Sequence, residues 1–246
     1  MIDLFQGLPA GVGISRLQVY DSESPDGIRG GSAHVHLSCT ESYVVIGGCG
    51  RLQTLSSAGF QEIELHANQV MWFTPGVVHR LVNEGDLDII IVMQNGGLPE
   101  SGDAILSFPE EYMKNPARYR EAAQLPPIER GRDLVDAHAK MRKDLSVAGF
   151  LELRAGVERN GPAVLEAFYR DAAALVEDNF GHWTALWHEG AVRATATTGA
   201  QLEALQGSDL SHLTQGALYV TQVRLGSPRA GMCGRITNFD VAEASA

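Results

Sequence analysis

The sequence is short of basic residues and of long apolar runs. It carries 19 Lys and Arg against 30 Asp and Glu, which gives a formal charge of −11 at neutral pH. Nucleic acids and anionic lipid surfaces repel such a chain, so we expect neither as a partner. No apolar run approaches the roughly 20 residues of a transmembrane helix, and we therefore expect no membrane span.

Cysteine is scarce as well. The three cysteines, Cys39, Cys49 and Cys233, are too few in 246 residues for a disulfide scaffold, which favours a reducing compartment. Asp3 stands where a secretory signal would carry basic residues. We therefore expect a cytoplasmic protein. The sequence also lacks a Cys-x-x-Cys pair, a Walker phosphate loop and a Gly-x-Ser-x-Gly motif, so none of these sites is predicted.

Short apolar segments dominate the first part of the chain. Residues rich in Val, Ile and Leu alternate with Gly, Asn, Asp and Ser turns between about positions 14 and 94. Regularly spaced segments of this kind predict strands of a sandwich or barrel. The clearest candidates are residues 33–35, 43–46, 51–55, 61–65, 70–73 and 87–94.

Helical patterns follow. Prolines interrupt residues 109–149, which predicts two or three short helices there, with a one-sided apolar stripe over 128–147. Another helical pattern follows Pro162. Strand-like segments return at residues 183–187, 192–197, 217–224 and 232–240. The predicted order is therefore β, then α, then a mixed part.

Three histidines and one glutamate form the most informative pattern. His34 and His36 are two residues apart, so on a strand both imidazoles face the same side of the sheet. Glu41 follows at an odd interval, and a bulge or bend is needed to aim it the same way. His79 leaves a Pro75-Gly76 turn. Three imidazoles and a carboxylate suit a borderline divalent cation and leave two positions of an octahedral ion open.

These residues resemble the two motifs of the cupin superfamily. The first motif matches as His34-x-His36, four intervening residues, Glu41 and, after five more, Gly47, with its leading glycine displaced. The second matches as Pro75-Gly76-x-x-His79-x-x-x-Asn83, without the residue usually found between Pro and Gly. The resemblance covers about a third of the chain. It implies a mainly β fold, a cupin-type β-barrel or jelly roll.

The resemblance also implies a metal enzyme. His34, His36, Glu41 and His79 would be the ligands, with iron as the first choice of metal and Mn, Ni, Cu, Co or Zn as alternatives. Because many cupin dioxygenases use such a set, we expect an oxidoreductase of the dioxygenase type that chelates a small organic substrate. Tyr43 shares a predicted face with Glu41 and is the candidate acid–base residue, although it is equally predicted as a core phenol.

Two other functions stay open. One is a non-redox cupin reaction, that is, an isomerase or epimerase, a cyclase or a lyase. The other is a non-catalytic cupin that only binds a small ligand. Oxygen consumption separates the first from a dioxygenase, and absence of turnover with any metal identifies the second. Cupins often pair through outer strands, so a homodimer or other homo-oligomer is expected.

The carboxyl-terminal part allows two interpretations. Shifted by 140 residues, positions 64–79 align with 204–219 without a gap, with Thr74 on Thr214 and Gly76 on Gly216. This predicts a degenerate second cupin barrel, in which Tyr219 replaces the motif histidine. The alternative is an extension that packs against a single barrel. The predicted division is residues 1–108 for the metal-binding barrel, 109–160 for a helical linker and 161–246 for the cupin-like or packing part.

Overall fold

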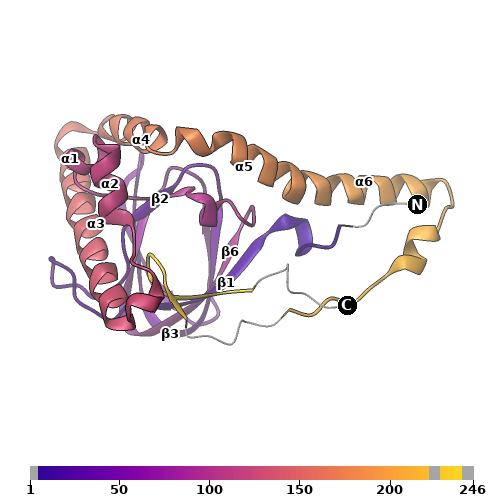
Figure 1. Cartoon of the computed structure of the whole chain (residues 1–246), viewed down its shortest axis with the longest axis horizontal. Coiled ribbons are helices and arrows are strands. Elements are labelled where there is room, and N and C mark those ends of the chain that lie inside the picture. The colour runs from indigo at the N-terminus through magenta and orange to yellow at the C-terminus, as the bar shows by residue number, and fades with distance from the viewer. Residues whose placement is uncertain (1–4, 222–227, 240–246) are drawn as a thin grey trace.

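A folded antiparallel sheet with helices on two adjacent sides makes up the molecule (Figure 1). The computed structural model describes residues 5–221 and 228–239. The strands are β1 (Gly13–Val19), β2 (His34–His36), β3 (Glu41–Ser56), β4 (Gly59–His66), β5 (Val70–Phe73), β6 (Val78–Met93), β7 (Ala104–Leu106), β8 (Arg229–Ala230) and β9 (Gly234–Asn238). The α-helices are α1 (Glu110–Met113), α2 (Pro116–Ala123), α3 (Arg132–Asn160), α4 (Val164–Ala174), α5 (Phe180–Trp187) and α6 (Arg193–Gln206).

Two long strands, β3 and β6, build the barrel by bending together. The first half of β3 (residues 41–45) pairs with the second half of β6 (residues 89–93). In this part of the sheet β5 lies beside β3 and β1 lies beside β6. The other halves pair over residues 50–55 and 78–83, beside β4 and β2. Between them the register shifts three times, and Gly48 adopts a φ of 70°. These irregularities turn the sheet back on itself, because bulges bend and twist a strand pair.

The strands predicted from the sequence are confirmed over the first part of the chain. Residues 43–46 and 51–55, expected as separate strands, are the two halves of β3, and the Gly47-Gly48 turn is its bend. The mainly β, barrel-type fold class is therefore confirmed. β7 was not among the predicted strands; it pairs with β2 and closes that side of the sheet.

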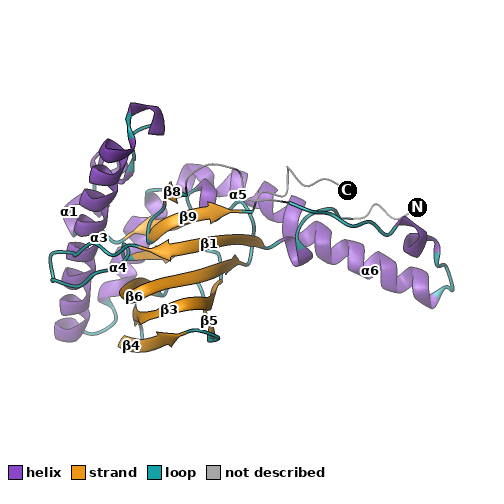
Figure 2. Cartoon of the chain, turned by 90° about the horizontal axis from the view of Figure 1, so that it is seen from below, coloured by secondary structure: helices purple, strands orange, loops and turns teal. Residues whose placement is uncertain are grey.

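Helix α3 covers the outer face of the barrel. Phe150 of α3 is completely buried in a cluster with Val78 of β6 and Ile105 of β7. The predicted stripe over residues 128–147 is part of this helix, which extends to Asn160. Figure 2 shows α1, α3 and α4 at one end of the strand stack and α6 extending beyond the other end. Within the described residues, no helix has both the length and the apolar character that crossing a bilayer requires.

The strands expected at residues 183–187 and 192–197 are wrong. Residues 183–187 lie in α5, and 192–197 lie in the π-turn and the start of α6. Trp183 and Trp187 are four residues apart, a spacing that places side chains on one face of a helix as well as of a strand. The alanines of the following segment favour the helix.

The aligned repeat does not form a second barrel in the described residues. Residues 204–206 end α6, and 211–215 form a 3₁₀ turn. The strand expected at 217–224 is not seen up to residue 221, apart from a single bridge residue at 220, and residues 222–227 lie outside the described ranges. The segment at 232–240 does yield β9, which pairs with β1 of the first sheet. The predicted division into residues 1–108, 109–160 and 161–246 stays a prediction.

Candidate metal centre

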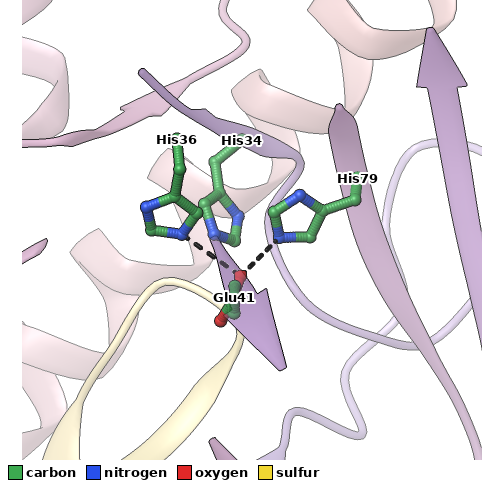
Figure 3. A group of neighbouring side chains, drawn as sticks. All are labelled: His34, His36, Glu41 and His79. Atoms are coloured by element: carbon green, nitrogen blue, oxygen red, sulfur yellow. Dashed lines mark ion pairs between the residues drawn. The ribbon is translucent and has the colours of Figure 1, made fainter. Parts of the chain in front are cut away.

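Three strands bring the four sequence-predicted ligands together. His34 and His36 lie on β2, Glu41 begins β3, and His79 lies on β6 directly opposite His34. All four side chains are buried, and one potential ligand atom from each lies within 4.8 Å of the others (Figure 3). The parity argument for His34 and His36 is therefore confirmed by their convergence on one point.

Glu41 reaches the cluster by a change of strand. Residues 37–40 are not part of any strand, so the chain leaves β2 before it enters β3. Glu41 then pairs in register with Phe73 on one side and Met93 on the other. The odd interval after His36 is accommodated by this crossing, whereas the sequence allowed a bulge within one strand.

The outer nitrogen of each imidazole has an acceptor outside the cluster. Nδ1 of His36 lies 2.9 Å from Oδ2 of Asp103, and Nδ1 of His79 lies 3.0 Å from the carbonyl oxygen of Val77. Nδ1 of His34 lies 3.4 Å from the carbonyl oxygen of Ser32. With the proton on Nδ1, each Nε2 presents its lone pair inward, as metal-binding histidines do.

The inner atoms fit a cation. Nε2 of His36 and Nε2 of His79 lie 3.2 and 3.1 Å from Oε2 of Glu41. These three atoms are buried, and none has a hydrogen-bond partner with suitable geometry among the described residues. Buried polar atoms without partners are costly unless a ligand satisfies them. Two imidazole nitrogens and a carboxylate oxygen facing one point, with His34 beside them, are able to hold a divalent transition metal.

Burial and the neighbouring charges shift the pKa values of the cluster in different directions. Burial lowers the pKa of His34 well below its usual value, and the neighbouring His79 and His36 lower it further, so His34 is neutral. Burial also acts against the charged form of His36, but Glu41 and Asp103 outweigh it and raise the pKa of His36 to about 9. Burial disfavours the Glu41 carboxylate, yet the two adjacent imidazoles hold the pKa of Glu41 far below its usual range.

The bent antiparallel barrel and the ligand cluster inside it match both parts of the cupin resemblance. The chain has a cupin-type fold. No protein-family model matches the sequence, and no curated protein matches it.

Solved structures with low similarity include several of this type. The Streptomyces protein PAC13, solved as a variant with uridine, is 13% identical over 37% of this chain and 64% of that chain, with a TM-score of 0.27. WlaRA from Campylobacter jejuni, a TDP-fucose-3,4-ketoisomerase, is 11% identical over 37% and 64%, with a TM-score of 0.30. A cupin protein from Bacteroides fragilis is 18% identical over 35% and 65%, with a TM-score of 0.26. With scores this low, no functional conclusion follows from these likenesses.

A cavity of about 410 Å³ opens beside the cluster of the cupin-type barrel. His34, His36 and Glu41 line it together with apolar side chains of β1 and β6 and with residues 229–233 of the β8–β9 hairpin. Trp72 of β5 is not among the lining residues and is 69% exposed. The apolar pocket with a few polar groups is the usual form of a small-ligand site.

Tyr43 lines this cavity and is completely buried. Its ring lies edge-on to Phe73, with centroids 5.4 Å apart, and 6.3 Å from the His79 ring. Burial, reinforced by the Glu41 carboxylate, raises the pKa of Tyr43 well above its usual value. The phenol therefore keeps its proton. Its role as an acid–base group stays a prediction.

Two residues near the cluster were not found from the sequence. Asp103 is fully buried and contacts His36, and its other oxygen accepts bonds from the backbone N–H and hydroxyl of Ser38. Arg142 of α3 lines the cavity. The only sequence signal for Asp103 is its place after Gly102 in a turn, and Arg142 is one of many charged residues on a helix.

Proposed function

We propose that this chain is a metal-dependent enzyme whose small organic substrate binds in the cavity beside His34, His36, Glu41 and His79. The observation that supports it is that Nε2 of His36, Nε2 of His79 and Oε2 of Glu41 converge in the barrel beside a largely apolar cavity, buried and without a hydrogen bond of suitable geometry. The two nitrogens approach the Glu41 oxygen at 3.2 and 3.1 Å, whereas the outer nitrogens have acceptors of their own. Buried polar atoms in this arrangement call for a ligand between them.

When bound, a divalent transition metal supplies Lewis acidity toward a substrate oxygen and, if redox active, a means of activating dioxygen. The protein's own groups do the rest. His34, His36, Glu41 and His79 would hold the cation, and the substrate would reach it from the cavity that three of them line. The apolar walls, among them Leu17 and Ile91, exclude water from the reacting end of the substrate.

Among the possible reactions, a non-redox one is favoured by a cavity residue, Tyr43. Tyr43 keeps its phenol O–H at the cavity wall, and because its raised pKa makes it a weak acid, we assign it as a hydrogen-bond donor that would stabilise charge developing on a substrate oxygen in an isomerisation, a dehydration or another lyase reaction. The resemblance of the ligand set implied a dioxygenase, but none of the described cavity residues specifically supports that reaction. Iron remains the first choice of metal only for that alternative.

Two measurements test the proposal. The purified full-length chain is analysed for bound metal and titrated with Fe(II), Mn(II), Co(II), Ni(II) and Zn(II), and the His79→Ala variant is treated in the same way. We expect stoichiometric binding to the wild type and loss of binding in the variant. The loaded forms are then incubated with enediols, catechols and sugar nucleotides under air and under nitrogen.

The outcome of those incubations separates the functions. Turnover that is equal with and without oxygen supports the isomerase or lyase version, and turnover that needs oxygen supports the dioxygenase. Tyr43→Phe should lower the turnover number at least tenfold while metal binding is kept, because the hydrogen-bond donor is gone and the ring remains. Failure of every metal to bind would refute the proposed function, and tight ligand binding without turnover would identify a binding protein.

A further inference from the structure

The cavity contains a cationic side chain that the metal cluster does not use. Arg142 of α3 contacts the turn of the β8–β9 hairpin, and this hairpin lies beside the helix. Its Nη1 donates to the carbonyl oxygen of Ala123 at 3.1 Å, and its Nη2 donates to that of Gly231 at 2.8 Å. Its Nε is buried and has no hydrogen-bond partner among the described residues.

No acid balances this charge. Other partly or fully buried arginines of the described chain have carboxylates, as Arg80 has Asp26 at 2.8 Å. Arg142 forms no ion pair with any described residue, and both of its acceptors are neutral carbonyls. Burial lowers the pKa of Arg142, and the nearby groups that act against this are two tyrosines and a cysteine. A guanidinium nevertheless stays protonated in proteins, so the positive charge remains on the cavity wall.

The other charges around the cavity leave Arg142 without compensation. With a divalent cation bound, the three imidazoles would be neutral, and the carboxylates of Glu41 and of the buried Asp103 behind His36 would together balance the cation. Arg142 would then be the positive charge on the wall that no buried carboxylate balances. Glu100 and Arg229 also line the cavity. Both are exposed at its rim, and their opposite charges offset one another. The interior therefore favours an anion over a neutral molecule of the same shape.

We propose that Arg142 binds an oxyanion and that the substrate of this cavity is a small organic molecule carrying a carboxylate or a phosphate group. This rests on the proposed function for the reacting end of the substrate, which the metal cluster would hold. The Arg142 Nε–H supplies the donor, and a planar guanidinium is the side chain best suited to carboxylate and phosphate oxygens.

Small probes test the site whatever the shape of the natural substrate. Inorganic phosphate and acetate are titrated into the ¹⁵N-labelled full-length chain, and acetamide serves as the neutral counterpart of acetate. The arginine Nε–H resonance of Arg142 is identified by its loss in Arg142→Lys. We expect this resonance to shift in a saturable way with phosphate and acetate and not with acetamide, in both metal-free and Zn(II)-loaded protein. A larger effect of phosphate than of acetate, or the reverse, tells which group the substrate carries.

Variants then separate binding from structural support, since Arg142 also holds the hairpin turn. Arg142→Gln should weaken acetate and phosphate binding at least tenfold, and Arg142→Lys should retain part of it because the charge stays. Arg16→Gln, on the exposed face of β1, is the matched control and should change nothing. Thermal unfolding is recorded for each variant. If Arg142→Gln does not fold, the titration of the wild-type Nε–H resonance and the anion affinity of Arg142→Lys still test whether Arg142 binds the anion.

Three results would overturn the inference: no saturable shift with either anion, an equal response to acetamide, or unchanged anion affinity in Arg142→Gln. Because the metal-free protein is measured separately, these results do not depend on whether the four ligands bind metal. Conversely, a chain that binds anions through Arg142 but takes up no metal would refute the proposed function and leave this inference standing.

Discussion

Single residues around the ligand cluster differ in what holds them in place. His34 and His79 point their Nδ1 atoms at backbone carbonyls of the same strand segment, whereas His36 points its Nδ1 at the carboxylate of Asp103. Carboxylates behind metal-binding histidines fix the ring orientation and increase the basicity of the inner nitrogen. Asp103 is itself fixed by two bonds from Ser38, so it forms a rigid support.

Asp103→Asn should weaken metal binding. The amide keeps the shape, but it cannot accept from His36 at one atom and from Ser38 at the other, because its nitrogen is a donor. We expect a roughly 10- to 100-fold loss of affinity, the usual effect of removing such a support. Competition with a chelating dye measures it. Asp88→Asn, which removes the partner of Arg16 on the sheet's other face, is the control. Equal affinities in a folded Asp103→Asn variant would contradict this role.

The cysteines should differ sharply in reactivity. Burial raises the pKa of Cys39 to about 12, and burial also raises that of Cys233, while Cys49 is exposed. A raised pKa keeps a thiol protonated until the pH approaches that value, and only the thiolate is nucleophilic. At pH 8 a disulfide reagent should therefore modify one thiol in the native chain and three in denaturant. Cys49→Ser should remove the native reaction, and rapid reaction of two thiols would be inconsistent with the burial.

The four residues of the cluster could be predicted from the sequence, but the residues that support them could not; their role as metal ligands stays a prediction. His34 and His36 follow from strand alternation, and Glu41 and His79 follow from the motif spacing. Asp103 is 67 residues from His36 and reaches it only because β7 pairs with β2. Arg142 depends on how α3 lies against the β8–β9 hairpin. Contacts between distant segments depend on tertiary packing, which no local pattern encodes.

At the scale of elements, the close contact of α3 with the barrel depends on a glycine. A Cβ on Gly149 would lie 2.2 Å from the carbonyl oxygen of Ser107 and 2.3 Å from the carbonyl carbon of Phe108. Both are backbone atoms of the segment that follows β7, so they cannot turn away as a side chain would.

Gly149→Ala should therefore destabilise the fold. We expect a loss of about 1–3 kcal/mol in unfolding free energy, because α3 must move off the barrel to admit the methyl group. Gly181→Ala in α5 is the matched control, since nothing lies within 4 Å of its added Cβ. That substitution should stabilise by up to about 1 kcal/mol through helix propensity. Denaturant unfolding measures both, and a stabilising Gly149→Ala would show that the contact is looser.

Secondary-structure elements could be predicted where the sequence fitted only one periodicity, either that of a strand or that of a helix. Most of the barrel strands, though not β7, and the helices up to residue 174 follow from alternation or from a helical stripe. Residues 183–197 satisfied both templates through Trp183 and Trp187, and the alanine content decided in favour of helix. The bend of β3 and β6 could not be predicted, because Gly47-Gly48 reads as a turn until the partner strand shows that pairing continues on both sides.

At the scale of the whole molecule, the expected homo-oligomer remains a prediction. β5 pairs only with β3 in the described sheet, so it is an edge, and it exposes Val70 by 59% and Trp72 by 69%. Exposed apolar edge strands favour pairing with another chain. Light scattering should give a multiple of 26.5 kDa for the wild type. The double variant Val70→Thr, Trp72→Gln should shift it toward the monomer, unlike Leu202→Gln on α6. A monomeric wild type would contradict the expectation.

Metal binding should stabilise the entire barrel, because the ligands come from three separate strands that meet only in the folded chain. A ligand that binds only the folded state at about 100 times its dissociation constant adds about 2.7 kcal/mol, or a rise in melting temperature of roughly 5–10 °C for a chain of this size. We expect that rise with Zn(II) or Mn(II), its reversal by a chelator, and its absence in His79→Ala. His66→Ala, an exposed histidine on β4, should keep it. Calorimetry measures all of these, and an equal shift in His79→Ala would mean that the metal binds elsewhere.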